Sequence, residues 1–341
     1  MAGVCRAHNV FSLSKGVVAR SDFDAGNLAN IVETGDFEYD IWTAPDNMGT
    51  AYEAKVQPYF YFALTGLPLG TNHLKFRICN PGIHQHSLYK QDMRPVYKSS
   101  STAHRWIRLK RNVRILNTEE EKCVFFEHVS APNESELSFA FTYPYSYDTL
   151  QRDLEAYEAQ YISRSSSNEP GLRASIYFLR ETLAYSPEGR RIDLITISSN
   201  TGRSSDCEPS IPLLFPERTG RRVCAAFPSK EVLFISARVH PGEVPASHTM
   251  KGMLDFLLDP DDLRAIELRN RYVLKIIPML NPDGVYRGRR SLHINTKSDL
   301  TSKRAFPLRP IRQQSQQILY EPQRDGASGN IRCSADSERL R

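Results

Sequence analysis

The sequence has no long apolar run. Its longest apolar stretches, Val232–Ser236 and Tyr272–Leu280, are the size of strands, whereas a membrane-spanning helix needs about 20 consecutive apolar residues. The first residues, Met1–His8, lead into mixed polar sequence, so the apolar core of a signal peptide is also missing. These absences exclude a membrane bundle and predict a cytoplasmic protein, with attachment to the cytoskeleton or residence in the nucleus left open.

Cysteine is scarce and scattered, with 6 residues in 341 and no Cys-x-x-Cys pair. That spacing argues against a cysteine-based zinc site. The hydrophobic share of 40% and the charged share of 24% are those of an ordinary globular protein. The length predicts about two domains.

Positive charge is concentrated at the C-terminal end. Residues 286–341 hold 12 Lys and Arg against 5 Asp and Glu, while the rest of the chain is close to neutral in sum. The segment 289–341 shows no sustained periodicity, so we expect a basic tail that is disordered or aberrant in sequence. A basic tail can contact nucleic acid, but a solvated end is the simpler interpretation, and no nucleic-acid partner is expected.

Residues 21–147, after an irregular start over 1–20, alternate between apolar and polar positions in several short runs. The runs are rich in aromatic and β-branched residues and are separated by Pro, Gly, Asn and Asp, which is typical of strands joined by turns. They predict an N-terminal antiparallel β-sandwich. The runs are Phe37–Trp42, Tyr59–Thr65, Leu74–Ile78, Cys123–Val129 and Leu137–Tyr143.

Residues 148–288 have a different pattern, in which helical and strand-like segments alternate. Helical spacing over Leu150–Tyr161 is followed by strand-like runs at Arg191–Ser198 and Glu231–Val239. A helix over Pro245–Leu258, a strand over Tyr272–Leu280 and a turn at Asn281–Gly284 come next. Strand, helix, strand predicts a βαβ unit with a parallel sheet. The predicted fold class is therefore α/β plus all-β.

One short stretch has the residue types of a metal site: Ser-Ala-Arg-Val-His-Pro-Gly-Glu at Ser236–Glu243. His240 and Glu243 can approach one metal ion if the backbone turns between them, and their nitrogen and oxygen donors suit Zn²⁺. The stretch follows a strand and precedes a helix, where open α/β sheets place ligands. The pair alone stays ambiguous, because a histidine in a structural turn would give the same sequence and a catalytic zinc usually has three protein ligands.

Three segments taken together resemble the cytosolic carboxypeptidase family, namely Ser236–Glu243, Lys251–Leu257 and Pro278–Val285. Upstream, Phe23–Leu28 and Phe139–Tyr147 are similar to the start and end of that family's N-terminal β domain. The resemblance covers residues 20–288. It implies a hydrolase, a zinc metalloprotease that removes C-terminal or branch-point glutamates from tubulin and other proteins. It also implies Zn²⁺ as the cofactor and His240 and Glu243 as metal ligands. The implied partners are glutamylated tubulin tails or other acidic C-terminal peptides, with no membrane involved.

The resemblance breaks off at Gly288. In the family, a third zinc ligand, the arginines that bind the substrate carboxylates and a glutamate general base all lie further on. His293 is not expected to replace the third ligand, and neither Glu321 nor Glu338 has the context of the base. We therefore predict an α/β zinc-carboxypeptidase domain over 148–288 that is incomplete and inactive, with its catalytic residues unassigned. Without later strands, the strand Tyr272–Leu280 is expected to expose an apolar edge or face.

A non-catalytic protein is the competing interpretation. The β-sandwich would then bind tubulin or another partner without chemistry. The basic and aromatic run Arg105–Arg111 is expected to be an exposed strand or loop, which would be able to meet acidic tails.

Overall fold

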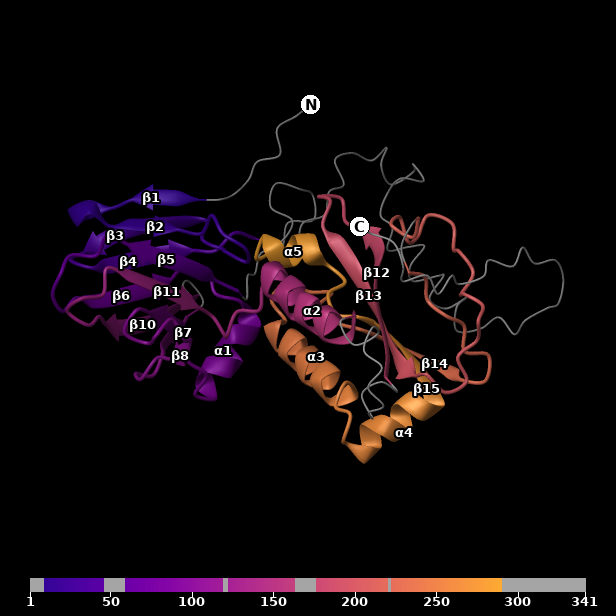
Figure 1. Cartoon of the computed structure of the whole chain (residues 1–341). Helices are drawn as coiled ribbons and strands as arrows, with labels where there is room; N and C mark the ends of the chain where they lie inside the picture. The colour runs from indigo at the N-terminus through magenta and orange to yellow at the C-terminus, as the bar shows by residue number, and fades with distance from the viewer. Residues whose placement is uncertain (1–8, 46–58, 119–121, 163–175, 220–221, 290–341) are drawn as a thin grey trace, which may run out of the picture. The chain divides into compact units, whose positions relative to one another are not determined.

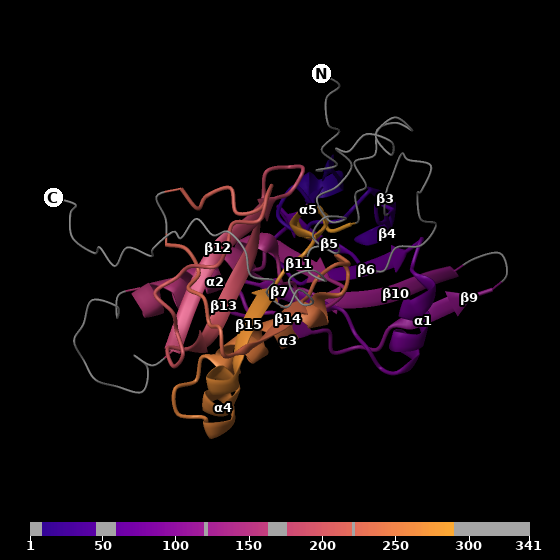
Figure 2. The same cartoon turned by 90° about the vertical axis from the view of Figure 1, so that its right-hand side faces the viewer.

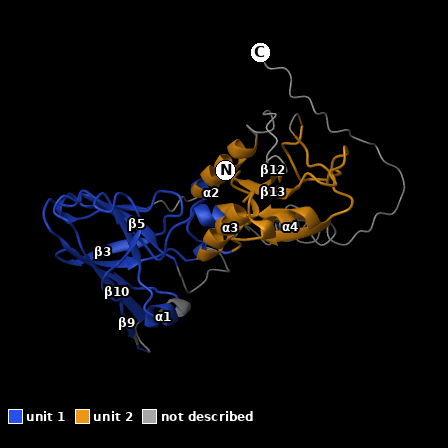
Figure 3. Cartoon of the chain, turned by 60° about the horizontal axis from the view of Figure 1, so that its bottom comes forward, with its two compact units in different colours: residues 1–148, 240–244, 283–295 blue, residues 149–239, 245–282, 296–341 orange. Residues whose placement is uncertain are grey.

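The computed structural model describes residues 9–45, 59–118, 122–162, 176–219 and 222–289 (Figure 1). The chain divides into two compact units (Figure 3). Unit 1 comprises residues 1–148, 240–244 and 283–295, and unit 2 comprises residues 149–239, 245–282 and 296–341. Two short pieces of the C-terminal half thus belong to the same unit as the N-terminal residues.

Unit 1 consists mainly of strands that form two sheets. The six-stranded sheet has the order β1-β2-β5-β11-β7-β8 and the five-stranded sheet the order β3-β4-β6-β10-β9. All neighbours pair antiparallel except β4 and β6, which are parallel. The strands are β1 (Val10–Ser12), β2 (Val18–Arg20), β3 (Asn30–Gly35), β4 (Glu38–Trp42), β5 (Tyr61–Thr65), β6 (His73–Ile78), β7 (Val96–Ser99), β8 (Ile107–Arg108), β9 (Arg114–Asn117), β10 (Lys122–Val129) and β11 (Glu136–Ala140). The helices are α1 (Ile83–Lys90) and α5 (Pro282–Tyr286), with a 3₁₀ turn at Ser14–Gly16.

An aromatic core joins the two sheets of unit 1. Phe62 and Phe139 come from the six-stranded sheet, Phe76 and Phe126 from the five-stranded sheet, and each is at most 2% exposed. The Phe76 ring centroid lies 4.9 Å from Phe126 and 4.9 Å from Phe139. In β6, the strand of Phe76, side chains from Leu74 onward are buried at every second residue, as expected when one face of a strand packs against a core. Burying each ring stabilises the unit by roughly 1.5–3 kcal/mol.

Unit 2 contains a four-stranded sheet of order β12-β13-β15-β14. The pairs β12–β13 and β13–β15 are antiparallel, and β14 runs parallel to β15 (Figure 2). The strands are β12 (Ile176–Tyr185), β13 (Arg191–Ser199), β14 (Glu231–Ser236) and β15 (Tyr272–Ile277). The helices are α2 (Tyr147–Ile162), α3 (Val244–Leu257) and α4 (Leu263–Arg271), of which α4 contacts β13 and β15.

Helices α2 and α3 lie side by side and are joined by polar contacts. The Tyr161 hydroxyl donates to the Leu258 carbonyl at 2.9 Å, and Lys251 Nζ donates to the Tyr157 hydroxyl at 3.1 Å. The ring of Tyr161 also stacks on Phe178 of β12, with centroids 5.3 Å apart. Through these contacts α2 connects the sheet to α3, the helix that follows Ser236–Glu243.

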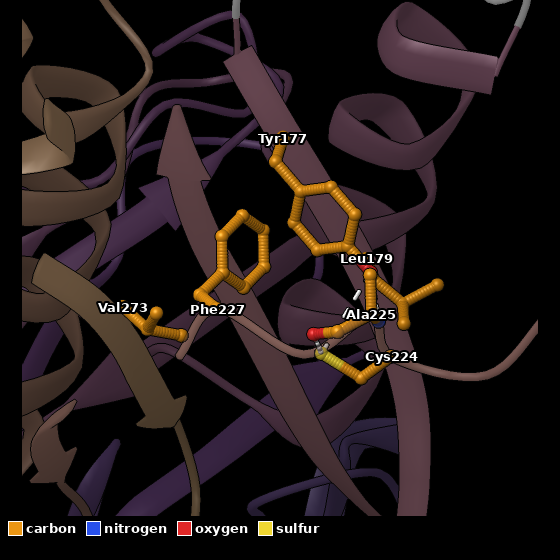
Figure 4. Packing of buried hydrophobic residues seen from close by; sticks show 6 residues of the cluster. All are labelled: Tyr177, Leu179, Cys224, Ala225, Phe227 and Val273. Carbon is orange, nitrogen blue, oxygen red and sulfur yellow. Dashed lines mark hydrogen bonds between the residues drawn. The ribbon is translucent and has the colours of Figure 1, made fainter. Parts of the chain in front are cut away.

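A small apolar cluster fixes the loop after β13 to the sheet (Figure 4). Its members are Tyr177, Leu179, Cys224, Ala225, Phe227 and Val273. The Ala225 amide donates to the Tyr177 hydroxyl at 3.0 Å. Lys275 contacts the cluster through Cys224: its Nζ donates to Cys224 Sγ at 3.3 Å and to Glu208 Oε2 at 2.7 Å. Burial alone would lower the pKa of Lys275, but Cys224 and Glu208 outweigh burial and raise it.

The structure confirms the predicted fold class, a β-rich region followed by an α/β region with a βαβ unit. Two expectations are wrong. Residues 1–20 are not irregular where they are described, because β1 and β2 pair there. The strand at Tyr272 is not the open edge either, since β15 lies between β13 and β14. Among the described strands of this sheet, the two edges are β12 and β14, and Leu233 of β14 is 37% exposed.

Within the described residues, no helix has both the length and the apolar composition that a bilayer crossing requires.

His128 of β10 makes the stability of unit 1 sensitive to acid. Burial lowers its pKa from 6.5 to about 4, so the unfolded chain binds this proton more tightly than the folded chain. Above pH 6.5 this histidine does not lower the free energy of unfolding. As the pH falls from 6.5 to about 4, the free energy of unfolding decreases, by roughly 3 kcal/mol in all. We expect His128→Gln to remove this loss, measured by urea unfolding at several pH values.

Tryptophan fluorescence suits the measurement, because Trp42 and Trp106 both lie in unit 1. His73→Gln, at an exposed histidine of β6, is the matched control and should keep the acid sensitivity of the wild type. Equal acid sensitivity of His128→Gln and the wild type would contradict the assignment.

Candidate metal centre

The centre is built where two parallel strands end together. β14 and β15 pair over six residues, from Glu231 opposite Tyr272 to Ser236 opposite Ile277. Beyond the strands, the Ala237 amide donates to the Ile277 carbonyl at 3.0 Å, and the Leu280 amide donates to the Ala237 carbonyl at 2.9 Å. The carboxyl end of β14 is thereby tied to the segment that leaves β15.

Arg238 and Asn281 hold the bend that follows. Arg238 has a φ of 57°, which turns the chain out of the strand. The Asn281 amide donates to the Arg238 carbonyl at 3.2 Å, and Asn281 Nδ2 donates to the Val239 carbonyl at 3.1 Å. The Arg238 side chain is only 2% exposed, and its Nη1 donates to Ser247 Oγ of α3 at 2.7 Å. The chain leading to His240 is therefore fixed by both side chain and backbone.

The side chains of His240 and Glu243 contact each other in the turn that follows this bend. The turn is closed by the Glu243 amide, which donates to the His240 carbonyl at 3.2 Å. His240 Nδ1 lies 2.7 Å from Glu243 Oε1. The two side chains are 46% and 60% exposed, so both can rotate and both can be reached from solvent.

The donor types of this pair fit zinc, but the pair is only part of a site. Nitrogen and oxygen ligands of a tetrahedral zinc with bonds of about 2.0–2.2 Å lie roughly 3.4 Å apart, so the two donors must separate by less than ~1 Å from their hydrogen-bonded distance. Exposed side chains allow that movement. No group of three or more His, Cys, Asp or Glu residues gathers around a common point in the part of the chain that the structure describes.

The structure thus brings His240 and Glu243 together as the sequence predicts, while their role as zinc ligands stays a prediction. His293, Glu321 and Glu338 lie outside the described residues. The turn expected at Asn281–Gly284 is instead the start of α5, which runs over Pro282–Tyr286. Proline suits the first position of a helix, where no amide donor is needed, and this favours the helix.

Sequence reasoning missed the residues that support the centre. Arg238 is a charged residue directly after an apolar strand, and Asn281 directly precedes a proline, but neither feature alone indicates a hydrogen-bond partner. A third missed residue is Asn27 in unit 1, which is 3% exposed. Its Nδ2 donates to the Tyr59 carbonyl at 3.0 Å and to the Gly288 carbonyl at 3.2 Å.

Gly288 permits this contact because it has no side chain. Its φ is +65°, and a Cβ atom there would lie 2.8 Å from the carbonyl oxygens of Ala25 and Gly26. The Ala25 amide donates to the Tyr286 carbonyl at 2.8 Å. The segment that follows α5 is therefore bound by the loop before β3, although 261 positions separate Asn27 from Gly288.

The chain is similar in sequence to known carboxypeptidases. The zinc carboxypeptidase family matches residues 174–318, which extends past Gly288. Cytosolic carboxypeptidase-like protein 5 of Bos taurus is 37% identical over 298 residues, covering 80% of this chain and 33% of its own length. Cytosolic carboxypeptidase 6 of Mus musculus is 31% identical over 270 residues, covering 78% of this chain and 42% of its own length. The chain spans about a third of the length of the first of these relatives.

Solved structures of metallo-carboxypeptidases have a fold similar to that of this chain. A metallo-carboxypeptidase from Burkholderia cenocepacia superposes with a TM-score of 0.59 at 19% identity, over 89% of this chain and 67% of the other. One from Pseudomonas aeruginosa, solved in complex with (2-guanidinoethylmercapto)succinic acid, gives a TM-score of 0.57 at 21% identity, over 88% of this chain and 66% of the other. These matches include both the β-rich region and the α/β region.

The paired donors predict a measurable metal affinity. We expect the full chain to bind Zn²⁺ weakly in calorimetric titration, and His240→Ala combined with Glu243→Gln to reduce the affinity by about tenfold or more. Affinity should fall as the pH is lowered, because zinc binds the neutral imidazole.

The matched control replaces another exposed histidine–glutamate pair. His73 Nε2 lies 3.0 Å from Glu127 Oε2 across β6 and β10. His73→Ala with Glu127→Gln should leave zinc affinity unchanged. Equal losses in the two double variants would mean that zinc binds without preference to any such pair, which would contradict the assignment of the centre.

Proposed function

Because this chain belongs to the zinc carboxypeptidases and is related to their cytosolic members, we propose that it serves the hydrolysis of C-terminal or branch-point glutamates of tubulin and other proteins in the cytoplasm. The observation that supports the proposal is the contact of His240 with Glu243 at the carboxyl end of β14. Both residues lie inside the segment that matches the zinc carboxypeptidases.

In this proposal His240 and Glu243 hold Zn²⁺. Zinc, when bound, activates a water molecule and polarises the scissile carbonyl. Neutral His240 would offer a ring lone pair, and the carboxylate of Glu243 would offset part of the charge of the ion. Arg238 and Asn281 hold the preceding bend, and the hydrogen bond from the Glu243 amide to the His240 carbonyl closes the turn in which the two donors lie close together.

The described residues do not complete a hydrolytic site. Two donors leave zinc weakly held, and no residue is assigned as the general base that takes a proton from water and passes it to the leaving amine. We therefore expect the 341-residue chain by itself to release no glutamate. To bind an acidic substrate, the protein would also need a positively charged surface.

A second candidate function is a non-catalytic interaction module. It is favoured by the self-contained aromatic core of unit 1, in which Phe62, Phe76, Phe126 and Phe139 join two sheets. A module of this kind would bind tubulin or another acidic partner whether or not the metal centre works.

The protein isolated from its source distinguishes the two functions. We expect the isolated protein to release glutamate from a peptide with C-terminal glutamates. A metal chelator should abolish that release, and so should His240→Ala, since zinc chemistry is required. His73→Ala should leave it unchanged.

Isolated protein that binds an acidic peptide but releases no glutamate from it at any zinc concentration would contradict the hydrolytic proposal. The interaction module would then be the function that fits the chain.

A further inference from the structure

Unit 1 carries a strongly basic surface that the metal centre does not use. Residues 90–114 contain eight Lys and Arg and a single acidic residue, Asp92. The local balance of +7 equals that of residues 286–341 in half the length. Four residues of this stretch, which we call the basic surface, are Lys98, Arg105, Arg108 and Lys110.

None of these four cations has a carboxylate partner among the described residues. The nearby ion pairs involve other basic residues: Arg94 with Asp92 at 3.5 Å and Arg111 with Glu127 at 2.7 Å. Arg105, Arg108 and Lys110 are exposed, and Lys98 is half-buried. Their charges are therefore available to a ligand.

Aromatic rings hold two of the cations in place. Val96 pairs with Arg108 across β7 and β8, so Lys98, Trp106 and Arg108 lie on one face of the sheet. Lys98 Nζ lies 5.2 Å from the centroid of the Trp106 ring, and the guanidinium of Arg108 lies 5.4 Å from that of Tyr143. Each contact is a cation–π interaction that stabilises the position of the cation.

The backbone around the surface is braced by arginine side chains. Arg94 Nη1 donates to the Lys110 carbonyl at 3.1 Å, and Arg108 Nη1 donates to the Arg94 carbonyl at 3.1 Å. These two hydrogen bonds join the segment before β7 to β8 and to the residues just after it. They hold like charges close together, an arrangement that costs free energy unless an anion offsets it.

We propose that the basic surface on β7, β8 and their flanking loops binds an acidic polypeptide segment. Guanidinium groups pair with carboxylates through two parallel hydrogen bonds, and both Arg105 and Arg108 present such a group. A run of glutamates would neutralise the four cations in an extended conformation. The inference deepens the proposed function, on which it rests for the choice of a glutamate-rich ligand, but it does not depend on hydrolysis.

The same charges would attract single-stranded nucleic acid, but the aromatic rings argue for peptide. Proteins that bind single strands offer free ring faces on which bases stack. Here the Trp106 and Tyr143 rings already have Lys98 and Arg108 over them, and Trp106 packs edge-on against Tyr61 with centroids 5.3 Å apart. These two rings therefore already serve as supports for the cations.

The test measures binding of a fluorescent peptide of about 20 residues, mostly glutamate, to the full chain by anisotropy. Reversing three charges together, Lys98→Glu, Arg105→Glu and Lys110→Glu, should weaken binding by about tenfold or more and flatten its dependence on salt. Arg108 is left unchanged because its hydrogen bond supports the fold. If the reversed variant does not fold, glutamine replaces glutamate at the same three positions.

The control reverses the same number of charges elsewhere, with Lys122→Glu, Arg203→Glu and Arg271→Glu. All three residues are exposed, and the basic tail is identical in both triple variants. Less than about a twofold change is expected for the control. An equal loss in both triple variants, or no loss in the first, would overturn the proposal.

Two further measurements separate this surface from its alternatives. His240→Ala should leave peptide binding unchanged. A loss there as large as in the first triple variant would place the peptide at the metal centre and overturn the proposal. An oligothymidine of equal charge should compete less well than unlabelled glutamate peptide, and stronger competition would overturn the proposal in favour of nucleic acid.

Discussion

The parallel pairing of β14 with β15 determines where Arg238 and Asn281, two of the residues that support the candidate metal centre, lie. Six residue pairs align the carboxyl ends of the two strands, so the bend at Arg238 and the residue Asn281 meet at one edge of the sheet. The pairing is possible because α3 and α4 carry the chain back across the sheet between the two strands. A one-residue slip of β15 would reverse the faces of that strand and move the Asn281 donor away from Val239.

The carboxypeptidase-like segment does not form a unit by itself. Residues 240–244 and 283–295 group with the β-rich region, whereas the strands that precede them belong to unit 2. The contacts of Asn27 and Ala25 with Gly288 and Tyr286 give this grouping a physical basis. The loop before β3 thus holds the chain just after α5, and the two donors of the metal centre belong to the same unit as the β-sheets.

Much of the fold could be predicted because it depends on local patterns. The predicted strand Leu74–Ile78 and the predicted helix Pro245–Leu258 have ends within one residue of those of β6 and α3 in the structure. The strand β12 was missed, since nine of its ten residues are buried on both faces and show no alternation. Helix α4 was missed as well, although Asp262 is an N-cap whose side chain accepts from the Arg264 and Ala265 amides.

The site and the surfaces were less predictable because they depend on residues distant in sequence. The pairing of His240 with Glu243 is local and was visible, while the contact of Asn27 with Gly288 spans 261 positions and leaves no sequence signal. The basic surface shows a different reason. The basic run Arg105–Arg111 was visible in the sequence, but summed over the chain outside the tail the charges nearly cancel, so the sum did not show how basic residues 90–114 are as a whole. Electrostatic attraction falls off over about 8–10 Å at physiological salt, so a partner responds to the local balance of residues 90–114 and not to the sum.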